Sequence, residues 1–208
     1  LVITASIIVF LLLNLLLGSV SIPFASVWNI LTGGEGDPIA WQNIILKSRL
    51  PQALTALVAG AGLSISGLQM QTIFRNPLAG PSVLGISSGA SLGVAFVVLL
   101  SGQLGGVALS RLGFIGEVAL SIAAIAGALS VMGLIVLASR KVAGSVTLLI
   151  IGVMIGYIAN AVIGVLKFFS VEGDIKAYVI WGLGSFARVS GNQMMLFVTI
   201  MAVIIPLS

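Results

Sequence analysis

The chain has 208 residues, of which 7% are charged and 59% are hydrophobic, and its formal net charge is +4. Because ordinary soluble domains carry about 25% charged residues, this composition excludes that class. The sequence has no cysteine and no histidine, so it offers no thiolate, no disulfide and no imidazole ligand or base. Its few cations are scattered instead of forming a stripe, which argues against a nucleic-acid partner. The composition predicts a membrane protein that is not an enzyme and has no metal site of its own.

The charged residues are separated by long charge-free runs. A helix needs about 20 mostly apolar residues to cross a bilayer core about 30 Å thick. The runs are continuous and do not alternate between apolar and polar residues, which favours helices over a β-barrel. We therefore predict an all-α, polytopic transmembrane helical bundle that forms one domain over residues 1–208. The expected spans are residues 1–20, 50–74, 83–100, 117–138, 147–168 and 193–208.

Both ends of the sequence lie inside apolar runs, so we expect a fragment of a longer chain, truncated at both ends. Lysine and arginine counts in the connections leave the orientation open, because the long and the short connections both carry cations. Two apolar stretches between spans, residues 21–33 with Trp28 and residues 177–186, are predicted to be either interfacial helices or ordered loops.

Small residues recur every four positions in three of the expected spans. The stripes consist of Gly60 with Ser64, of Gly85 with Gly89 and Gly93, and of Gly152 with Gly156 and Asn160. In lipid, such stripes let helix backbones approach closely and form interhelical hydrogen bonds. The same spacing would also suit a wall of an aqueous pathway, and the local sequence does not decide between packing and pathway.

The central portions of the expected spans contain no Asp, Glu, Lys, Arg or His. Ion-coupled and proton-coupled carriers usually place such a residue inside the membrane, so the sequence argues against a secondary carrier. The chain also lacks a glycine-rich phosphate loop that ends in Gly-Lys-Ser/Thr. Uphill transport would therefore need energy from a separate subunit.

The most specific motif is a turn between two small-residue helices, which reads Arg75-Asn76-Pro77-Leu78-Ala79-Gly80-Pro81. It follows Gly60 to Gln71 and precedes Leu84-Gly85-Ile86-Ser87-Ser88-Gly89-Ala90-Ser91-Leu92-Gly93. In order and spacing, this stretch closely resembles the permease subunits of type II ABC importers, the family that takes up iron-siderophore complexes, haem and cobalamin. The resemblance extends more weakly through residues 148–160 and 181–186.

The resemblance implies a subunit of ten helices in the bacterial inner membrane, of which six are present. It implies as partners a second permease subunit, identical or different, two cytoplasmic ATPases and a periplasmic or lipid-anchored binding protein, besides membrane lipid. ATP and magnesium would bind to the ATPase, and this chain would bind no cofactor. The connections 75–82 and 139–146 would be cytoplasmic. Alternatives are a permease for a free metal ion or another small solute, and a secondary carrier; the chelate that is carried stays open.

Roles at matching positions follow from the same resemblance. Arg49 would pair with a carboxylate of the binding protein, with Lys47 partly replacing the second family arginine, whose position here holds Gln52. The cytoplasmic gate would comprise Gly144, Ser145, Val146 and Thr147. The pathway would be lined by Gly152, Gly156 and Asn160. Apart from the resemblance, the spacing of small residues predicts that Gly60, Ser64, Gly85, Gly89 and Gly93 serve helix packing.

Overall fold

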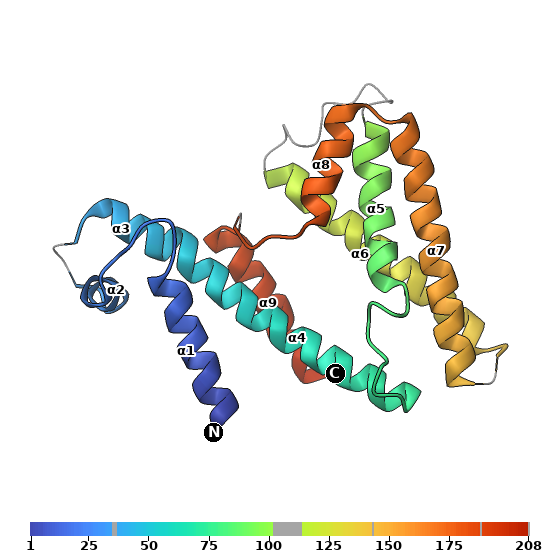
Figure 1. Cartoon of the computed structure of the whole chain (residues 1–208), viewed down its shortest axis with the longest axis horizontal. Coiled ribbons are helices and arrows are strands. Elements are labelled where there is room, and N and C mark those ends of the chain that lie inside the picture. Colours follow the sequence, from blue (N-terminus) through green and yellow to red (C-terminus); the bar gives the residue numbers. More distant parts are fainter. Residues whose placement is uncertain (35–36, 102–113, 143, 188, 208) are drawn as a thin grey trace. The chain divides into compact units, whose positions relative to one another are not determined.

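The computed structural model describes residues 1–34, 37–101, 114–142, 144–187 and 189–207. All regular secondary structure in these residues is helical (Figure 1). The helices are α1 (Val2–Leu16), α2 (Phe24–Leu31), α3 (Ile39–Ile44), the π-helix η1 (Ile45–Arg49), α4 (Leu50–Phe74), α5 (Ile86–Ser101), α6 (Phe114–Ser139), α7 (Ser145–Phe169), α8 (Glu172–Gly182) and α9 (Gly191–Leu207). The all-α class predicted from the composition is confirmed.

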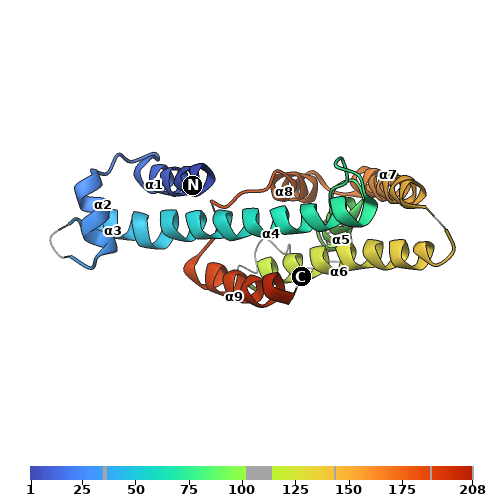
Figure 2. The same cartoon turned by 90° about the horizontal axis from the view of Figure 1, so that it is seen from below.

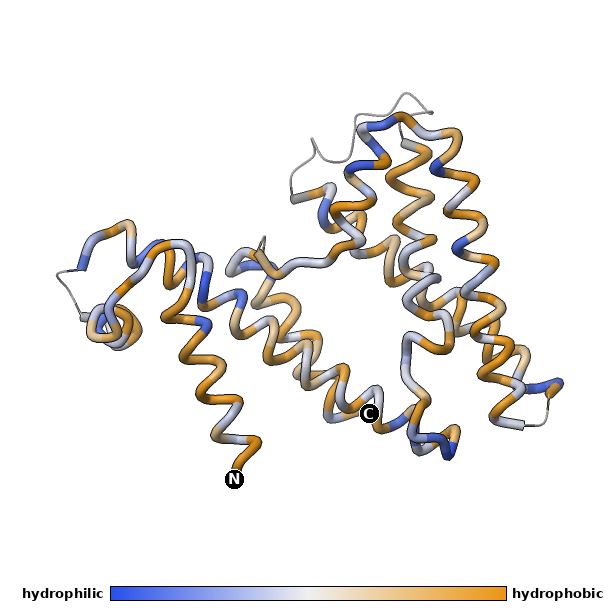
Figure 3. The backbone as a smooth tube through the Cα atoms, in the orientation of Figure 1, coloured by the Kyte–Doolittle hydropathy of each residue, from blue (hydrophilic) through white to orange (hydrophobic). Residues whose placement is uncertain are grey.

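Helices occur at all six expected spans. The helical runs Ile39–Phe74, Ile115–Ser139 and Ser145–Phe169 are long and apolar enough to cross a membrane. The other three, Val2–Leu16, Ile86–Leu100 and Gly191–Leu207, are apolar but shorter. Hydrophobic residues run along these helices, whereas hydrophilic residues gather mainly at helix ends and connections (Figure 3).

The second span begins earlier than the sequence predicts. The expected span starts at residue 50, just before Pro51, but the helical run begins at Ile39 and passes through η1 into α4. A proline ring inside an α-helix collides with the carbonyl four residues before it. The wider π-turn directly before Pro51 relieves that collision, so the run continues through the proline.

The described chain divides into two compact units, and the prediction of a single domain stays a prediction. Unit 1 comprises residues 1–65 and 185–208, and unit 2 comprises residues 66–184. Figure 2 shows the helices of both units from a second direction. The core of unit 1 joins α1, α2 and η1 through buried aliphatic side chains. These are Leu15, Ile22, Val27, Ile30 and Ile45.

Unit 2 is built around α5, which packs against α6, α7 and α8 (Figure 1). One apolar cluster gathers around Val94, Ala95 and Leu99 of α5, with Ile163 of α7 and Tyr178 of α8. A second cluster lies at the other end of the unit, and it contains Phe74, Ala79, Leu84, Val131 and Ile135. Burial of these side chains fixes the positions of α5 and α7, which carry the predicted pathway residues and two of the predicted packing glycines.

Candidate functional site

The contact between α5 and α6 brings backbone atoms of the two helices close together. A Cβ added to Gly89 would lie 2.7 Å from the carbonyl oxygen of Gly127, and one added to Gly93 would lie 2.1 Å from the carbonyl oxygen of Ala123. A Cβ on Gly127 would lie 2.1 Å from the carbonyl oxygen of Gly89. These distances are too short for any side chain. The structure therefore places Gly89 and Gly93, with Gly127, where helix packing requires glycine.

The contact between α5 and α7 is equally close. Gly85 has a φ of +71°, which favours glycine, and a Cβ on it would lie 2.6 Å from the carbonyl oxygen of Gly152. A Cβ on Gly152 would lie 2.8 Å from the Cα of Leu84, and Gly156 is buried beside Gly85. Gly152 and Gly156 thus hold α7 against α5. Their surface is covered within the chain, and the pathway-lining role that the family resemblance implied for them stays a prediction.

Two other faces of α7 remain uncovered by the described residues. Val153, Tyr157, Asn160 and Gly164 share one face, since they recur at intervals of three and four residues. Tyr157 is 67% exposed, Asn160 is exposed, and no atom lies within 4 Å of a Cβ placed on Gly164. The remaining face is aliphatic and exposed, and it consists of Ile150, Met154, Ile158 and Val165. Of the three predicted pathway residues, only Asn160 lies on an open polar face.

Tyr157 was missed by the sequence analysis. It lies three residues before Asn160 and shares its exposed face. The signal was available, because residues three apart on a helix are neighbours on its surface. The sequence analysis instead predicted a pathway role for Gly152 and Gly156, which belong to a stripe of small residues.

The predicted gate connects α6 to α7. Gly144 has a φ of +135° and stands directly before the first residue of α7, which begins at Ser145. Val146 and Thr147 are exposed on the first turn of the helix. The gate segment therefore combines a residue with wide conformational freedom and the start of the helix that carries Asn160. Its role as a gate stays a prediction.

The signature turn is stabilised by its own polar groups. Arg75 has a φ of +47° at the end of α4, and the backbone N–H of Asn76 donates to the carbonyl of Gln71. The side-chain oxygen of Asn76 accepts a hydrogen bond from the backbone N–H of Leu78 at 2.9 Å. The Gln71 amide donates to the carbonyl of Pro77 at 3.2 Å. Asn76 and the proline after it thus end α4 and redirect the chain.

Within this turn the side chains differ in exposure. Ala79 is buried in the cluster with Phe74 and Leu84, whereas Arg75 and Leu78 are exposed. Pro81 is partly buried where the chain approaches α5. The turn therefore anchors itself through Ala79 and presents Arg75 and Leu78 outward.

Arg49, which the family resemblance implied to be a docking residue, is buried within unit 1. Its side chain is only 6% exposed, and its guanidinium donates to the carbonyl oxygens of Leu15 at 2.7 Å and Leu16 at 3.1 Å. A further hydrogen bond joins it to the carbonyl of Val20. The last carbonyls of a helix lack partners inside the helix, so Arg49 supplies donors to the end of α1. In this chain the buried guanidinium is committed to backbone carbonyls, and the docking role of Arg49 stays a prediction.

The other two predicted docking residues have different surroundings. Lys47 is exposed on η1 and is available to a partner. Gln52 is partly buried, and its amide donates to Ser48 Oγ at 3.0 Å and to the carbonyl of Ala187 at 3.4 Å. Gln52 therefore ties α4 to the segment before α9 within unit 1. A docking role for Lys47 stays a prediction.

Gly60 and Ser64 were predicted to pack against a neighbouring helix. A Cβ on Gly60 would meet no atom within 4 Å, and Ser64 is exposed. The Ser64 hydroxyl donates to the carbonyl of Gly60 at 2.8 Å along its own helix. Among the described residues, this stripe has no close neighbour, and its packing role stays a prediction.

Helix α8 is held against α5 and α7 by contacts of Tyr178. Tyr178 is buried in the cluster around Val94, and Lys167 places its ammonium nitrogen 4.8 Å from the centre of the Tyr178 ring. Burial raises the pKa of the Tyr178 phenol, and a hydrogen bond with Ser91 opposes this shift. One side of α8 is buried against protein, whereas Val179 and Ile180 are exposed, and the choice between an interfacial helix and an ordered loop for residues 177–186 stays a prediction.

These features match a known transport family. The model of the FecCD transport family matches residues 6–208. The chain belongs to the FecCD transport family. Membership confirms the resemblance that the signature turn carried, since this family includes the type II importer permeases to which the turn pointed.

Individual curated proteins and a solved structure are also similar to this chain. The vitamin B12 import system permease protein BtuC of Salmonella paratyphi A is 36% identical over 172 residues, which cover 82% of this chain and 48% of the relative. The same protein of Salmonella typhi gives the same values. Among solved structures, a metal-chelate type ABC transporter in an inward-facing conformation matches with a TM-score of 0.75 and 26% identity, over 96% of this chain and 57% of that chain. The FecCD chain described here thus spans about half the length of the curated relatives that it matches.

Proposed function

We propose that this FecCD chain is part of the transmembrane permease subunit of an ABC importer, and that the importer carries a metal chelate of the iron-siderophore, haem or cobalamin class. The observation that carries the proposal is the family match over residues 6–208. The similarity to a vitamin B12 permease and to a metal-chelate type transporter supports the chelate class. We further propose that the chain lies in the bacterial inner membrane.

The chemistry of the open face of α7 supports a passive pathway. Its neutral side chains, Tyr157 and Asn160, offer hydrogen bonds and an aromatic edge but no charge. A pathway for a bare cation would be expected to present carboxylates or imidazoles. In the part of the chain that the structure describes, no three His, Cys, Asp or Glu side chains gather to hold a metal ion. A large neutralised chelate suits such a wall better than a free ion does.

The partners follow from the same proposal. Two ATPase subunits would bind ATP and magnesium and would drive the conformational change, since this chain has no phosphate-binding loop. A second permease subunit would complete the pathway. A binding protein would deliver the chelate to the face of the permease on which Lys47 lies. The connection 75–82, with Arg75 and Leu78 exposed, would face the cytoplasm.

The substrate class is tested by transport in vesicles. The complete importer is reconstituted with its binding protein, and uptake of cobalamin, a ferric siderophore, haem and free ferric ion is measured with and without ATP. We expect ATP-dependent uptake of one of the three chelates and none of the free ion. Uptake of free ferric ion, or uptake driven by an ion gradient without ATP, would overturn the proposal.

Cysteine labelling of the α7 face that carries Tyr157 and Asn160 gives a second test. Residues 1–208 contain no native cysteine that would react with the label. In an otherwise cysteine-free importer, we expect Asn160→Cys and Ser145→Cys to react with a water-soluble thiol reagent at rates that change with the bound nucleotide. Ile158→Cys is the matched control, because Ile158 is exposed on the aliphatic face of the same helix. A thiol in lipid does not form the reactive thiolate, so Ile158→Cys should stay unmodified. If Asn160→Cys is inert in every nucleotide state, Asn160 does not line the pathway.

A further inference from the structure

Helix α2 has a polar and an apolar side in addition to its buried side. Val27 and Ile30 are buried in the core of unit 1. At 100° per residue, Phe24, Trp28 and Leu31 form a second stripe, and their side chains are 57%, 60% and 38% exposed. This exposed stripe is apolar throughout. It is called the Phe24–Trp28–Leu31 stripe below.

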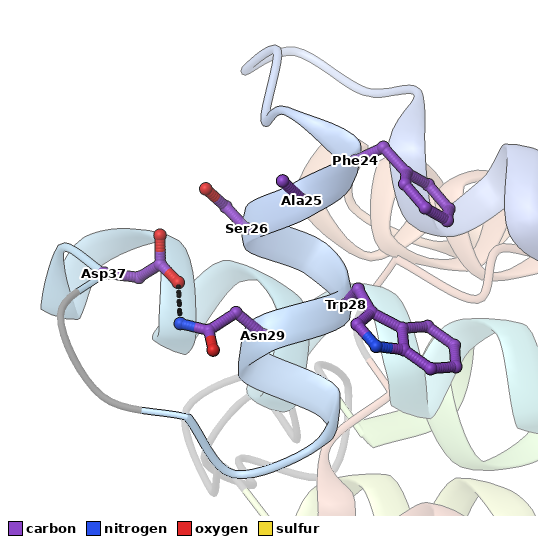
Figure 4. Close-up of a pocket in the computed structure, with 6 residues that line it drawn as sticks. All are labelled: Phe24, Ala25, Ser26, Trp28, Asn29 and Asp37. Carbon is purple, nitrogen blue, oxygen red and sulfur yellow. Dashed lines mark hydrogen bonds between the residues drawn. The ribbon is translucent and has the colours of Figure 1, made fainter.

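Polar groups occupy the opposite side of the same helix. Figure 4 shows Phe24 and Trp28 on one side of α2, with Ser26 and Asn29 on the other, around a pocket that these residues line. The Asn29 amide donates to an Asp37 carboxylate oxygen at 2.8 Å. The charged carboxylate of Asp37 therefore lies on the polar side of α2. Helix α2 thus separates apolar from polar groups around its axis.

The end of α2 is locally fixed. The Thr32 hydroxyl donates to the carbonyl of Trp28 at 2.9 Å and to that of Asn29 at 3.1 Å. Gly33 follows with a φ of +80°, which ends the helix. The helix therefore has a defined length of 8 residues, and its exposed stripe is a stable feature of unit 1.

The orientation of α2 within unit 1 indicates what meets this stripe. Figure 1 looks almost along the axis of α2, whereas α1 and α4 run across the picture. The carbonyl end of α1 packs on α2 through Leu15 and Val27. If α1 and α4 run through the bilayer, a helix that lies across the end of α1 lies parallel to the membrane surface. Its apolar stripe and its polar side are then turned to lipid and to water, respectively.

We propose that α2 lies in the boundary between lipid head groups and acyl chains, with the Phe24–Trp28–Leu31 stripe in lipid and Ser26, Asn29 and Asp37 in water. Tryptophan is enriched at this depth because its ring is apolar and its indole N–H is polar. The stripe has no charged residue that would pair with a protein partner. Exposed apolar side chains also occur on α1, among them Phe10 and Leu13. Amphipathic helices bind membrane surfaces by this division of faces.

The test uses spin labels on single cysteines in the complete importer, reconstituted in vesicles of phosphatidylcholine and phosphatidylglycerol. Labels at Phe24→Cys and Trp28→Cys are compared with the matched control Ser26→Cys. We expect collisions with oxygen, which dissolves in lipid, to dominate at positions 24 and 28, and collisions with a water-soluble nickel chelate to dominate at position 26. The ratio of the two collision rates should differ several-fold between the faces.

Two results would overturn the proposal. The first is equal access of the nickel chelate to positions 24 and 26, which would place both faces in water. The second is exclusion of both probes at positions 24 and 28, either in the importer alone or after the binding protein is added, which would place the stripe against protein. Should these variants fail to fold, the native Trp28 is tested in an importer in which Trp41, Trp181 and every tryptophan outside residues 1–208 are replaced by phenylalanine. Brominated lipids should quench Trp28 fluorescence, and an unquenched Trp28 would overturn the proposal as well.

Discussion

Replacing Arg49 by alanine is expected to lower the free energy of unfolding of the permease by about 2 to 4 kcal/mol. The substitution removes the donors that satisfy the carbonyls of Leu15, Leu16 and Val20. A buried polar group without a partner costs about 1 to 3 kcal/mol, and Arg49 serves more than one such group. Thermal or denaturant unfolding of the detergent-solubilised importer measures the loss.

Lys47→Ala is the matched control for Arg49→Ala, because Lys47 is an exposed cation two residues away on the same π-helix. It should leave the free energy of unfolding nearly unchanged. Arg49→Lys should recover only part of the stability, since one ammonium group does not reproduce the fork of the guanidinium. If Arg49→Ala is as stable as the wild type but binds the binding protein more weakly, Arg49 is a docking residue after all.

The second large effect is expected for Gly127→Ala on α6. The added methyl group would lie 2.1 Å from the carbonyl oxygen of Gly89 and 3.0 Å from the backbone nitrogen of Gly93. Since both obstacles are backbone atoms, α5 and α6 must separate along their whole contact. Overpacking of this kind typically costs about 1 to 3 kcal/mol, and this site should fall at the upper end. Unfolding of the solubilised importer again measures the loss.

Gly133→Ala provides the control on the same helix. No atom lies within 4 Å of a Cβ placed on Gly133, so the methyl group meets open space in this chain. Alanine also loses less backbone entropy than glycine in a helix, which favours a neutral or slightly stabilising outcome. Equal losses for Gly127→Ala and Gly133→Ala would show that the α5–α6 contact is not as close as the structure has it.

The sequence predicted the signature turn and several of the helix positions well, because those features depend on local residue types. Asn76 and Pro77 end α4 through local hydrogen bonds and restricted backbone angles, and these effects act over a few residues. The start of the second span was less predictable. Pro51 favours a helix start, but the π-helical turn before it lets the helix continue. No residue pattern in the local sequence predicts that turn.

The candidate site shows the same division between local and distant effects. The spacing of Gly152, Gly156 and Asn160 establishes that small residues lie near one another on α7, but not which neighbour they meet. In the structure, the two glycines are buried against Leu84 and Gly85, whereas Asn160 stays on an open face. Only the position of α5 distinguishes packing glycines from a pathway residue.

By itself, the sequence predicted the all-α class, and its signature turn pointed to the family to which the chain belongs. The low share of charged residues indicates that the chain folds in lipid and not in water. The residues of the signature turn, 75–81, indicate its family. Tertiary structure alone decided what Arg49 does and which face of α7 is open. The guanidinium meets carbonyls that lie 29 to 34 residues earlier in the chain, and a buried cation cannot be told from an exposed one by residue type. Such roles depend on which distant backbone atoms the fold brings within hydrogen-bonding distance.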